Sequence, residues 1–489
     1  MNYPFNKPQN EPVLDYEPGS PKKDALKLRI KELKSENIVV PIIIDGNEIE
    51  TTETASIDIP HNHKETLGVF HKAGQKEINL AIESSLDAWN SWSKTSLEER
   101  CSIFNKAADL LSDKWRNTIN AATMLNMSKN VYQSEIDAAC ELIDFFRFNS
   151  WYAYELSQHQ PMYSPENITN TLEMRPLEGF VFAVSPFNFA SIGGNLPSAP
   201  ALMGNVAIWK PASSAVLPAY YIMRLLEEAG LPKGVINFVP GSGSTIGPII
   251  MDHTMLAGVH FTGSTKVFKG MWSTIGKNID KYLSYPRIVG ETGGKDFCVA
   301  HESANIDVLS TAMVRGAFEY QGQKCSAMSR AYIPSTIWPS LKEIYVDQVK
   351  SITMGDPEDF SHFMNAVIDQ SAFDSIKNYI DYAKKSSLAE VITGGNYDDA
   401  DGYFIEPTTI VTSDPNFKTM CEEIFGPVLT IYIYEPNEWS KVLKLIDSTS
   451  EYALTGCVIS EDKSAIIEAK DVLTHSAGNF YINDKPTGA

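Results

Sequence analysis

The sequence predicts an α/β protein built on two doubly wound parallel sheets, and three observations support this fold class. The chain has 489 residues, a length more typical of several domains than of one. Short apolar strands alternate with helical segments between residues 179 and 290, and the alternation resumes after Gly293-Gly294 and continues to Ile482. Strands separated by helices form parallel sheets covered on both faces. Such sheets bind ligands at the carboxyl ends of their strands, where we expect the functional residues.

The composition is that of a folded, acidic protein. Hydrophobic residues make up 43% of the chain and charged residues 21%, which is typical of globular proteins. The formal net charge of -20 argues against binding to a nucleic-acid backbone, because that binding needs clustered positive charge. No uninterrupted apolar segment approaches the roughly 20 residues that span a bilayer. We therefore expect a small-molecule substrate as partner, and neither a nucleic acid nor a membrane.

The cysteines indicate a reducing compartment. The six of them are far apart, at positions 101, 140, 298, 325, 421 and 457. No two have the close spacing of a zinc or dithiol motif, so we predict no metal site and no disulfide framework.

The N-terminal segment lacks the apolar core of a secretory signal, and its first 28 residues contain four acids and no arginine, unlike a mitochondrial transit peptide. We expect a cytoplasmic protein, with the mitochondrial matrix as the alternative if the N-terminus is that of a processed form.

The chain begins with an extended arm. Residues 1–22 are rich in Pro, Asn and Gly, and a helix is predicted over residues 23–35. Residues 38–66 contain β-branched runs interrupted by Asp45-Gly46-Asn47, which is typical of a hairpin turn.

A long helical region follows from Lys76 to Trp151. Its last helix is predicted over residues 135–151, with apolar residues at three- and four-residue steps. Glu141, Asp144 and Arg147 form a polar stripe on this helix. Such a stripe is more often a solvated face with ion pairs than a binding site.

Residues 156–177 interrupt the regular pattern. They contain Pro161, Pro165 and Asn167 followed by an alternating segment, which favours a projecting β-hairpin. The first alternating region comes next, with predicted strands at 180–184, 206–209, 235–239 and 258–261 and helices at 191–203 and 217–229. The second region has predicted strands at 297–300 and 330–333 and helices at 308–320 and 338–351.

One cysteine has a sequence environment that favours reactivity. Cys325 stands among small and polar residues, beside Lys324 and near Arg330. A structural cysteine usually lies in an apolar segment, whereas nearby positive charge stabilises the thiolate. Thiolates are strong nucleophiles, so covalent catalysis is one interpretation of this segment. On these residues alone, an inert loop cysteine is an equally good interpretation.

Two polar residues follow predicted strands of the first region. Asn188 comes after the strand at 180–184, and its amide could donate to a developing oxyanion. Lys210 follows the strand at 206–209 and could reach a ribose or a phosphate. Each has a more common explanation, since an asparagine in a turn usually serves the turn and a lysine at a strand end is usually solvated.

Two glycine clusters and two carboxylates complete the candidates. Residues 240–247 and 261–265 place free backbone N–H groups where a helix begins, which suits a phosphate, although neither cluster is a GxGxxG or P-loop motif. Glu291 lies beside Gly293-Gly294 and is a candidate general base. Glu423 precedes a predicted strand and is equally compatible with a surface acid.

Taken in order, these motifs resemble the aldehyde dehydrogenase superfamily over nearly the whole chain. The shared motifs are Pro186-Phe187-Asn188-Phe189, Trp209-Lys210-Pro211, Phe261-Thr262-Gly263-Ser264, Glu291-Thr292-Gly293-Gly294-Lys295, Gly322-Gln323-Lys324-Cys325 and Glu423-Ile424-Phe425-Gly426-Pro427. Any one of them arises by chance, whereas six in this order are specific. Finer features are similar to the Δ1-pyrroline-5-carboxylate dehydrogenase branch, namely residues 145–149, 191–195, 325–330 and 478–485.

The resemblance implies a role for each matching residue. Cys325 would be the nucleophile, Asn188 would stabilise the oxyanion, and Glu291 would activate the water that hydrolyses a thioester. NAD would be the cofactor, held by Ser185, Pro186, Phe187, Lys210, Gly243, Gly247, Gly263, Ser264, Thr265, Glu423 and Phe425. Ser213 stands where many relatives carry a glutamate that disfavours a 2′-phosphate, so NADP remains an alternative.

The implied reaction is the NAD-dependent oxidation of L-glutamate γ-semialdehyde to L-glutamate in proline degradation. The substrate would contact Glu141, Ser326, Ser329, Gly488 and Ala489, with Glu141 near its ammonium group and the last two residues at its carboxylate. One alternative is a CoA-acylating or different semialdehyde dehydrogenase, and Glu291 argues against CoA acylation because no water is then needed. Another is a catalytically silent homologue.

The resemblance also implies how the chain is divided. Residues 1–155 and 178–290 would form an NAD-binding domain with the N-terminal arm, and residues 291–475 a catalytic domain. The hairpin at 156–177 would join the subunits of a homo-oligomer, a dimer or larger. Residues 476–489 would begin a substrate-anchoring loop whose remainder is absent.

Overall fold

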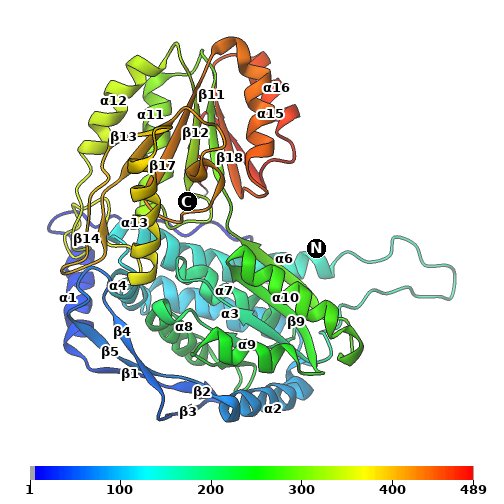
Figure 1. Cartoon of the computed structure of the whole chain (residues 1–489). Coiled ribbons are helices and arrows are strands. Elements are labelled where there is room, and N and C mark those ends of the chain that lie inside the picture. The colour runs from blue at the N-terminus through cyan, green and yellow to red at the C-terminus, as the bar shows by residue number, and fades with distance from the viewer. Residues whose placement is uncertain (1–5, 488–489) are drawn as a thin grey trace. The chain divides into compact units, whose positions relative to one another are not determined.

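The computed structural model describes residues 6–487, which form two compact units (Figure 1). The first unit comprises the chain up to Asp58, Thr66–Met127 and Val131–Glu291. The second comprises Ile59–Glu65, Ser128–Asn130 and the chain from Thr292 onward, so it takes in two short segments from the N-terminal half. Among residues 6–487, none of the helices combines the length and apolar character needed to span a bilayer.

A seven-stranded sheet forms the centre of the first unit, in the order β10-β9-β6-β7-β8-β2-β3. Its strands are β2 (Ile42–Ile44), β3 (Asn47–Ile49), β6 (Phe180–Val184), β7 (Val206–Lys210), β8 (Ile236–Phe238), β9 (Leu256–Gly263) and β10 (Arg287–Thr292). Strands β9, β6, β7 and β8 are parallel to one another, which confirms the prediction from the alternating pattern. Because β6 and β7 are buried along almost their whole length, they are apolar rather than alternating in sequence.

The predicted hairpin near the N-terminus is also confirmed. Strands β2 and β3 pair antiparallel through Asp45 (φ 52°) and Gly46 (φ 67°). Both residues are left-handed, as a tight two-residue hairpin turn requires. A separate three-stranded sheet contains β1 (Ile38–Val40), β5 (Thr66–His71) and β4 (Thr54–Asp58).

Helices surround the main sheet of the first unit. They are α1 (Pro21–Ser35), α2 (Gln75–Trp92), α3 (Leu97–Ser112), α4 (Arg116–Met127), α5 (Val131–Ser134), α6 (Glu141–Ser157), α7 (Ala190–Leu202), α8 (Val216–Ala229), α9 (Gly243–Met251) and α10 (Thr265–Lys277). The helix predicted over residues 135–151 is formed, but its first six residues are a π-helical turn, η1 (Glu135–Cys140). Glu141 is the first residue of α6, directly after this turn.

The second unit contains another seven-stranded sheet, in the order β13-β16-β17-β12-β11-β18-β19. Its strands are β11 (Asp296–Ala300), β12 (Met328–Pro334), β13 (Ala389–Thr393), β16 (Thr408–Thr412), β17 (Val428–Tyr434), β18 (Thr455–Ile459) and β19 (Asn479–Ile482). All pairs are parallel except β13 with β16. The two doubly wound sheets predicted from the sequence are thus both present.

Helices cover both faces of this second sheet. Alternate residues of β11 enter different hydrophobic clusters: Phe297 and Val299 pack with α13 (Gln370–Lys385), α15 (Trp439–Thr449) and α16 (Lys463–Val472). Cys298 and Ala300 pack with α11 (Ile306–Phe318) and α12 (Trp338–Lys350). The segments that contain Cys325 and Glu423 precede β12 and β17, at the amino ends of these parallel strands. In this sheet the expectation that candidate residues lie at carboxyl strand ends is therefore corrected.

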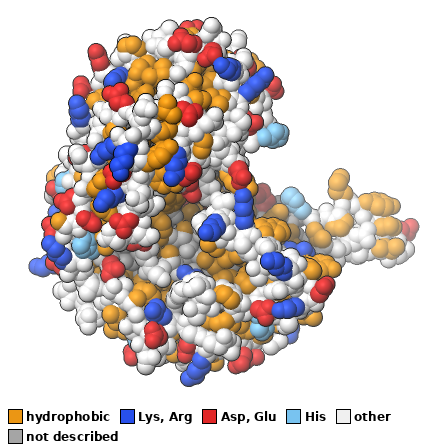
Figure 2. All heavy atoms as spheres, in the orientation of Figure 1, with side chains coloured by type: hydrophobic (Ala, Val, Ile, Leu, Met, Phe, Trp, Pro, Cys, Tyr) orange, Lys and Arg blue, Asp and Glu red, His pale blue; other side chains and the backbone are white. Residues whose placement is uncertain are grey.

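The β-hairpin predicted at residues 156–177 is not formed by strands. Helix α6 extends to Ser157, and the segment from there to β6 is irregular and leaves the first unit as a long excursion (Figure 1). The Gln160 side chain bonds both the N–H (2.9 Å) and the carbonyl (3.1 Å) of Leu172, in place of a backbone ladder. Pro161 and Pro165 lack the N–H groups that a ladder needs. Exposed apolar side chains gather on this excursion, including Met162 and Tyr163 (Figure 2).

Candidate active site

The parallel strands of the first unit bring three predicted motifs to one edge of the sheet. Val184, the last residue of β6, pairs with Lys210 of β7 and with Phe261 of β9. The segments that follow these strands therefore start side by side. Ser185 is buried there: its Oγ accepts from the Trp209 indole N–H at 3.0 Å, and its N–H donates to the Lys210 carbonyl at 3.2 Å.

A groove of about 880 Å³ lies between α2, α9 and α10 in the same unit. Gly243 and Gly247 line it, as do residues of α10. The side chain of Lys210 passes Gly243, since a Cβ at that glycine would be 3.9 Å from Lys210 Cε. Desolvation at this half-buried position lowers the pKa of Lys210 to about 8.

Two helices begin beside the predicted cofactor residues. Ser242 caps α9, and Ser264 caps α10 by accepting from the Val267 N–H at 3.4 Å. A helix N-terminus presents unpaired N–H groups and favours an anion. The groove, its glycines, the two helix starts and a lysine are together the kind of site that a dinucleotide fits. The geometry of the first unit is therefore compatible with NAD as the cofactor.

Two further predicted residues lie on or next to helices of the first unit. Asn188 is 3% exposed and stands between β6 and the start of α7. The Glu141 carboxylate accepts from the Ser191 hydroxyl at 2.6 Å, which joins α6 to α7. The two helices approach closely at Gly194, where a Cβ would be 3.1 Å from the Leu142 side chain. We predicted no individual role for Ser191. Its position in the shared motif at residues 191–195 was the signal that could have indicated one.

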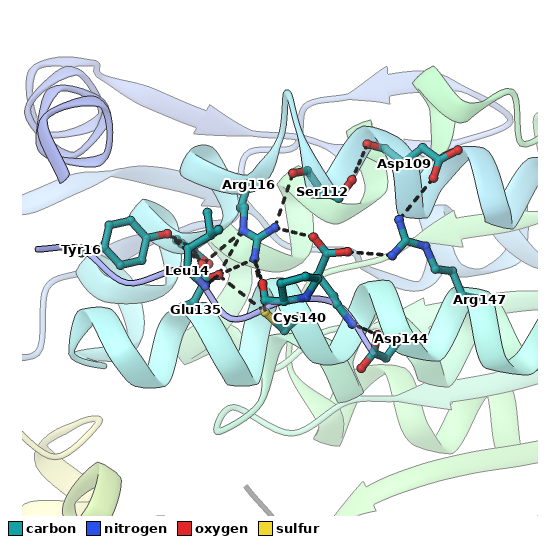
Figure 3. Close-up of polar contacts among 12 residues, drawn as sticks. Leu14, Tyr16, Asp109, Ser112, Arg116, Glu135, Cys140, Asp144 and Arg147 are labelled. Atoms are coloured by element: carbon teal, nitrogen blue, oxygen red, sulfur yellow. Dashed lines mark hydrogen bonds and ion pairs between the residues drawn. The ribbon is translucent and has the colours of Figure 1, made fainter. Parts of the chain in front are cut away.

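The π-helical turn before Glu141 is held by a buried ion pair (Figure 3). Arg116 of α4 and Glu135 of η1 are 5% and 0% exposed, and Arg116 Nε donates to Glu135 Oε1 at 3.1 Å. The N-terminal arm supplies two more donors to this carboxylate, the Leu14 N–H (2.8 Å) and the Tyr16 hydroxyl (2.7 Å). Glu11 of the arm accepts from Arg116 at 2.6 Å. The arm predicted from composition is thus attached to the helix that carries Glu141.

We expect Glu135→Gln to lower the free energy of unfolding by about 3–5 kcal/mol, because it leaves a buried guanidinium without its main counter-ion. Burial alone would raise the pKa of Glu135, but the bonds from Arg116, Leu14 and Tyr16 outweigh it and lower the pKa. A depressed carboxyl pKa stabilises the fold fully above the unfolded-state pKa of about 4.3, and this contribution is lost progressively as the pH falls from there through the lower folded-state pKa. Urea unfolding of both proteins at pH 7 and pH 4 measures it, with the difference shrinking at the lower pH.

Asp109→Asn is the matched control for this prediction, since Asp109 contacts Arg147 in the same cluster but is largely exposed. It should leave stability unchanged. Equal losses in the two variants would show that the buried pair has no special part in holding the arm.

The nucleophile candidate of the second unit follows a strained turn. Tyr320, Gln321 and Gly322 are consecutive left-handed residues, with φ of 49°, 54° and 65°. A non-glycine residue in this region costs about 1 kcal/mol or more. Gly322 is required by space as well, since a Cβ there would be 2.3 Å from the Gly426 carbonyl oxygen. The loop before Cys325 and the loop after Glu423 therefore touch backbone to backbone.

Gln321 holds this turn in place. Its buried amide donates to the carbonyls of Ser128 (3.2 Å) and Ala366 (2.7 Å) and accepts from the Asn365 N–H (3.1 Å). Gln323 adds a bond from the Ile368 N–H at 2.9 Å. These bonds compensate for the backbone strain, and they join the turn to segments far away in the sequence.

The two cations expected beside the thiol have other partners. Lys324 is buried, with its Nζ 3.5 Å from Glu319. Arg330, 1% exposed, donates to the carbonyls of Lys295 (2.9 Å) and Ile446 (3.1 Å). The interpretation of Arg330 as a partner of the thiolate is therefore corrected: on a strand its side chain points into the helix-covered core.

All six cysteines are free thiols, and their burial separates them. Cys325 and Cys421 are partly exposed, whereas the other four are buried. Burial raises the pKa of the Cys421 thiol, although Arg330 and Lys295 act in the opposite direction. Among the thiols, Cys325 is the one in the turn directly before β12, at the amino ends of the parallel strands of the second sheet.

The glycine turn, Gly293-Gly294, contacts the side chain of Glu423. Gly294 N–H donates to Glu423 Oε1 at 3.1 Å, and a Cβ at Gly293 would be 1.7 Å from the same oxygen. A larger residue at 293 would displace the carboxylate. Phe425, which follows, has a left-handed φ of 55°. Three predicted motifs of the second unit thus converge, while Glu291 lies half-buried on β10 of the first unit.

The predicted substrate residues have different surroundings. Ser326 is buried with its Oγ 3.1 Å from Thr487 Oγ1, so the residue after the nucleophile touches the C-terminal segment. The Ser329 hydroxyl donates to the Asp296 carbonyl at 3.3 Å, a bond within the sheet. Gly488 and Ala489 lie outside the described residues.

Two buried ionisable residues after the glycine turn were missed by the sequence reasoning. Lys295 is 0% exposed, and within residues 6–487 its Nζ has no hydrogen-bond partner. Burial, with a contribution from Arg330, lowers the pKa of Lys295 to about 7. Asp296 is 1% exposed and accepts from Thr455. No local signal indicated their burial, because lysine and aspartate are rarely fully buried.

The chain matches a family model over most of its length. The model described as "Aldehyde dehydrogenase family" matches residues 48–489. A protein of Dictyostelium discoideum named "Delta-1-pyrroline-5-carboxylate dehydrogenase, mitochondrial" is 49% identical over 484 residues, 99% of this chain and 87% of that protein. A human protein of the same name is 46% identical over 481 residues, 98% of this chain and 85% of that protein.

A solved structure has the same fold. The Delta-pyrroline-5-carboxylate dehydrogenase from Mycobacterium tuberculosis, crystallised with NAD, superimposes with a TM-score of 0.96 at 46% sequence identity. The match covers 100% of this chain and 90% of that one.

Proposed function

Since the chain belongs to the aldehyde dehydrogenase family, we propose that it oxidises L-glutamate γ-semialdehyde, the open form of Δ1-pyrroline-5-carboxylate, to L-glutamate with NAD. The observation that carries this proposal is the similarity over the whole chain to relatives with that name, at 46–49% identity. The reaction belongs to proline degradation. Convergence of the Cys325, Glu423 and glycine-turn loops in the second unit supports it.

Cys325 is the proposed nucleophile. Its sulfur attacks the aldehyde carbon, and the oxyanion that forms is stabilised by the Asn188 amide and the Cys325 backbone N–H. Bound NAD would accept the hydride whose loss converts this adduct into a thioester. Glu291 then takes a proton from water, the resulting hydroxide attacks the thioester carbonyl, and the C–S bond breaks to release glutamate and the thiolate.

The proposed cofactor residues are those that the resemblance implies. Lys210 and Glu423 would bind the two riboses, and the starts of α9 and α10, with Ser264 and Gly243, would face the phosphates. Ser185, Pro186, Phe187, Gly247, Gly263, Thr265 and Phe425 complete the proposed set. Ser213 carries no charge to repel a 2′-phosphate, so NADP is the second cofactor to test.

Substrate selection is proposed to rest on Glu141 and on the serines after the nucleophile. Glu141, held by Ser191, would accept from the substrate ammonium group. Ser326 and Ser329 would contact the substrate beside the nucleophile, and the N–H groups of Gly488 and Ala489 would bind its α-carboxylate. Of the two serines, Ser326 is the one that contacts the C-terminal segment.

Cellular place and assembly are also part of the proposal. Six free thiols suit a reducing compartment, for which we propose the cytoplasm, with the mitochondrial matrix second because the similar proteins in Dictyostelium discoideum and Homo sapiens are named mitochondrial. The exposed apolar residues of the excursion at 156–177 would be covered by another subunit of a homo-oligomer.

Reduction of NAD on adding pyrroline-5-carboxylate, succinate semialdehyde or propanal tests the proposed function. We expect the highest kcat/KM for pyrroline-5-carboxylate, with free glutamate as product. Acyl-CoA formed in the presence of CoA would instead identify an acylating enzyme. Absence of turnover with every aldehyde, together with no alkylation of Cys325 by iodoacetamide at neutral pH, would indicate a catalytically silent homologue.

A further inference from the structure

The hydroxyl of Thr455 lies at the centre of a buried cluster in the second unit. Thr455, the first residue of β18, is 1% exposed. Its Oγ1 is 2.6 Å from Asp296 Oδ2 and 3.1 Å from the Ser326 carbonyl oxygen, and it also contacts the Pro486 carbonyl oxygen. These three oxygens come from β11, from the loop that carries the nucleophile, and from the C-terminal segment.

The cluster contains more acceptors than one hydroxyl can serve. Thr455 has a single hydroxyl proton, and all three surrounding oxygens are acceptors when Asp296 is ionised. A proton on Asp296 reduces this excess: the carboxyl donates to Thr455 Oγ1, and Thr455 donates to one of the two carbonyls. The carboxyl is also fixed by the backbone N–H groups of Leu454 (2.9 Å) and Thr455 (3.0 Å), which both forms can accept.

The charges around Asp296 are compatible with both of its forms. Burial raises the pKa of Asp296 to about 7, against the opposing effects of Thr455, Leu454 and Arg330. Arg330 on β12 and the adjacent Lys295 are the cations facing it, and the pKa of Lys295 is itself lowered to about 7 by burial. We therefore expect Asp296 to lose this proton as the pH rises through the neutral range.

We propose that Asp296 and Thr455 are positioning residues for substrate recognition. Their hydrogen-bond chain joins the backbone at Ser326, next to the nucleophile, to the backbone at Pro486. The contact between the Ser326 and Thr487 hydroxyls is a second link between the same two segments. This inference rests on the proposed function, because it takes the C-terminal segment to bind the semialdehyde's carboxylate.

The test is Thr455→Val, which keeps the side-chain shape and removes the hydroxyl. We expect KM for pyrroline-5-carboxylate to rise about 10-fold or more, with KM for NAD and for propanal changing less than about threefold. In deuterium exchange of the protein, the amides of Asp484, Lys485 and Thr487, which flank the amide-free Pro486, should lose protection at least about 10-fold. Thr455→Ser, which restores the hydroxyl, should recover both.

Thr430→Val is the matched control, since Thr430 is a buried strand threonine bonded to Thr419 at 2.8 Å and not to the C-terminal segment. It should change neither KM nor exchange at 484–487. Unchanged exchange in Thr455→Val would overturn the positioning role whatever the substrate. Wild-type protein that oxidises propanal but not pyrroline-5-carboxylate would instead overturn the proposed function.

Asp296→Asn removes the ionisation: its amide can donate to Thr455 Oγ1 at every pH, although its nitrogen cannot accept from the Thr455 N–H as Asp296 Oδ2 does. Between pH 6 and pH 8.5, wild-type protection of residues 484–487, corrected for intrinsic exchange, should fall as Asp296 ionises. The asparagine variant should show a flat profile. Parallel profiles in the two proteins would show that Asp296 holds no proton that matters here.

Discussion

Cys325→Ala should lower kcat for aldehyde oxidation by about 10⁴-fold or more, because removing a covalent nucleophile leaves only binding and oxyanion stabilisation. The variant should still bind NAD, which calorimetry can show, since no predicted cofactor residue is changed. Turnover is measured by NADH absorbance with pyrroline-5-carboxylate.

Cys421→Ser is the control for this variant. Cys421 is the other partly exposed cysteine, and its replacement should leave kcat within about twofold, as expected for a residue outside the chemistry. If Cys325→Ala kept more than about a hundredth of wild-type activity, the nucleophile would have to be another group.

Glu291→Gln should slow steady-state turnover by about 10²–10⁴-fold, the usual contribution of a general base. The first turnover should be affected far less, because the hydride is lost before water attacks the thioester. Rapid mixing should therefore show a burst of NADH matching the concentration of active sites, followed by a slow phase. Mass spectrometry of the quenched protein should find the acyl group on Cys325.

Glu422→Gln provides the comparison, since Glu422 is an exposed carboxylate whose side chain accepts from the Tyr379 hydroxyl. It should retain normal steady-state rates. A burst that shrinks in proportion to the steady-state rate of Glu291→Gln would place Glu291 before the hydride step and refute its role as deacylation base.

The sequence predicted the two sheets because buried parallel strands need continuous apolar residues, and those runs are visible locally. The turn at Asp45-Gly46 was predictable for the same reason, since its backbone demands particular residues. The excursion at 156–177 was predicted wrongly as strands. There the alternating residues suggested two paired strands. The two prolines lack the N–H groups that strand pairing needs, and the Gln160 side chain bonds the Leu172 backbone instead. The π-helical turn was not predicted, because six residues are too few for its spacing of apolar residues to differ visibly from that of an α-helix.

The candidate site was predictable where a motif and the carboxyl end of a strand coincide, as at Ser185 and Lys210. Cys325 instead precedes β12 and was indicated by its motif alone. The site was not predictable where long-range hydrogen bonds decide the geometry. No prediction was made for Gln321, although its amide joins three separate backbone groups. The partner of Asp296 is Thr455, and no local pattern pairs residues so far apart.

Because of where the other cysteines lie, the proposed nucleophile can be labelled selectively and used as a spectroscopic probe of the site. Four thiols are sealed in the core, and at Cys421 the raised pKa leaves little thiolate at neutral pH. A Cys421→Ser protein should therefore take up one fluorescent or fluorine-bearing label, at position 325. Emission or chemical shift from that label would follow ligand occupancy and loop motion next to the reacting carbon, without a coupled assay.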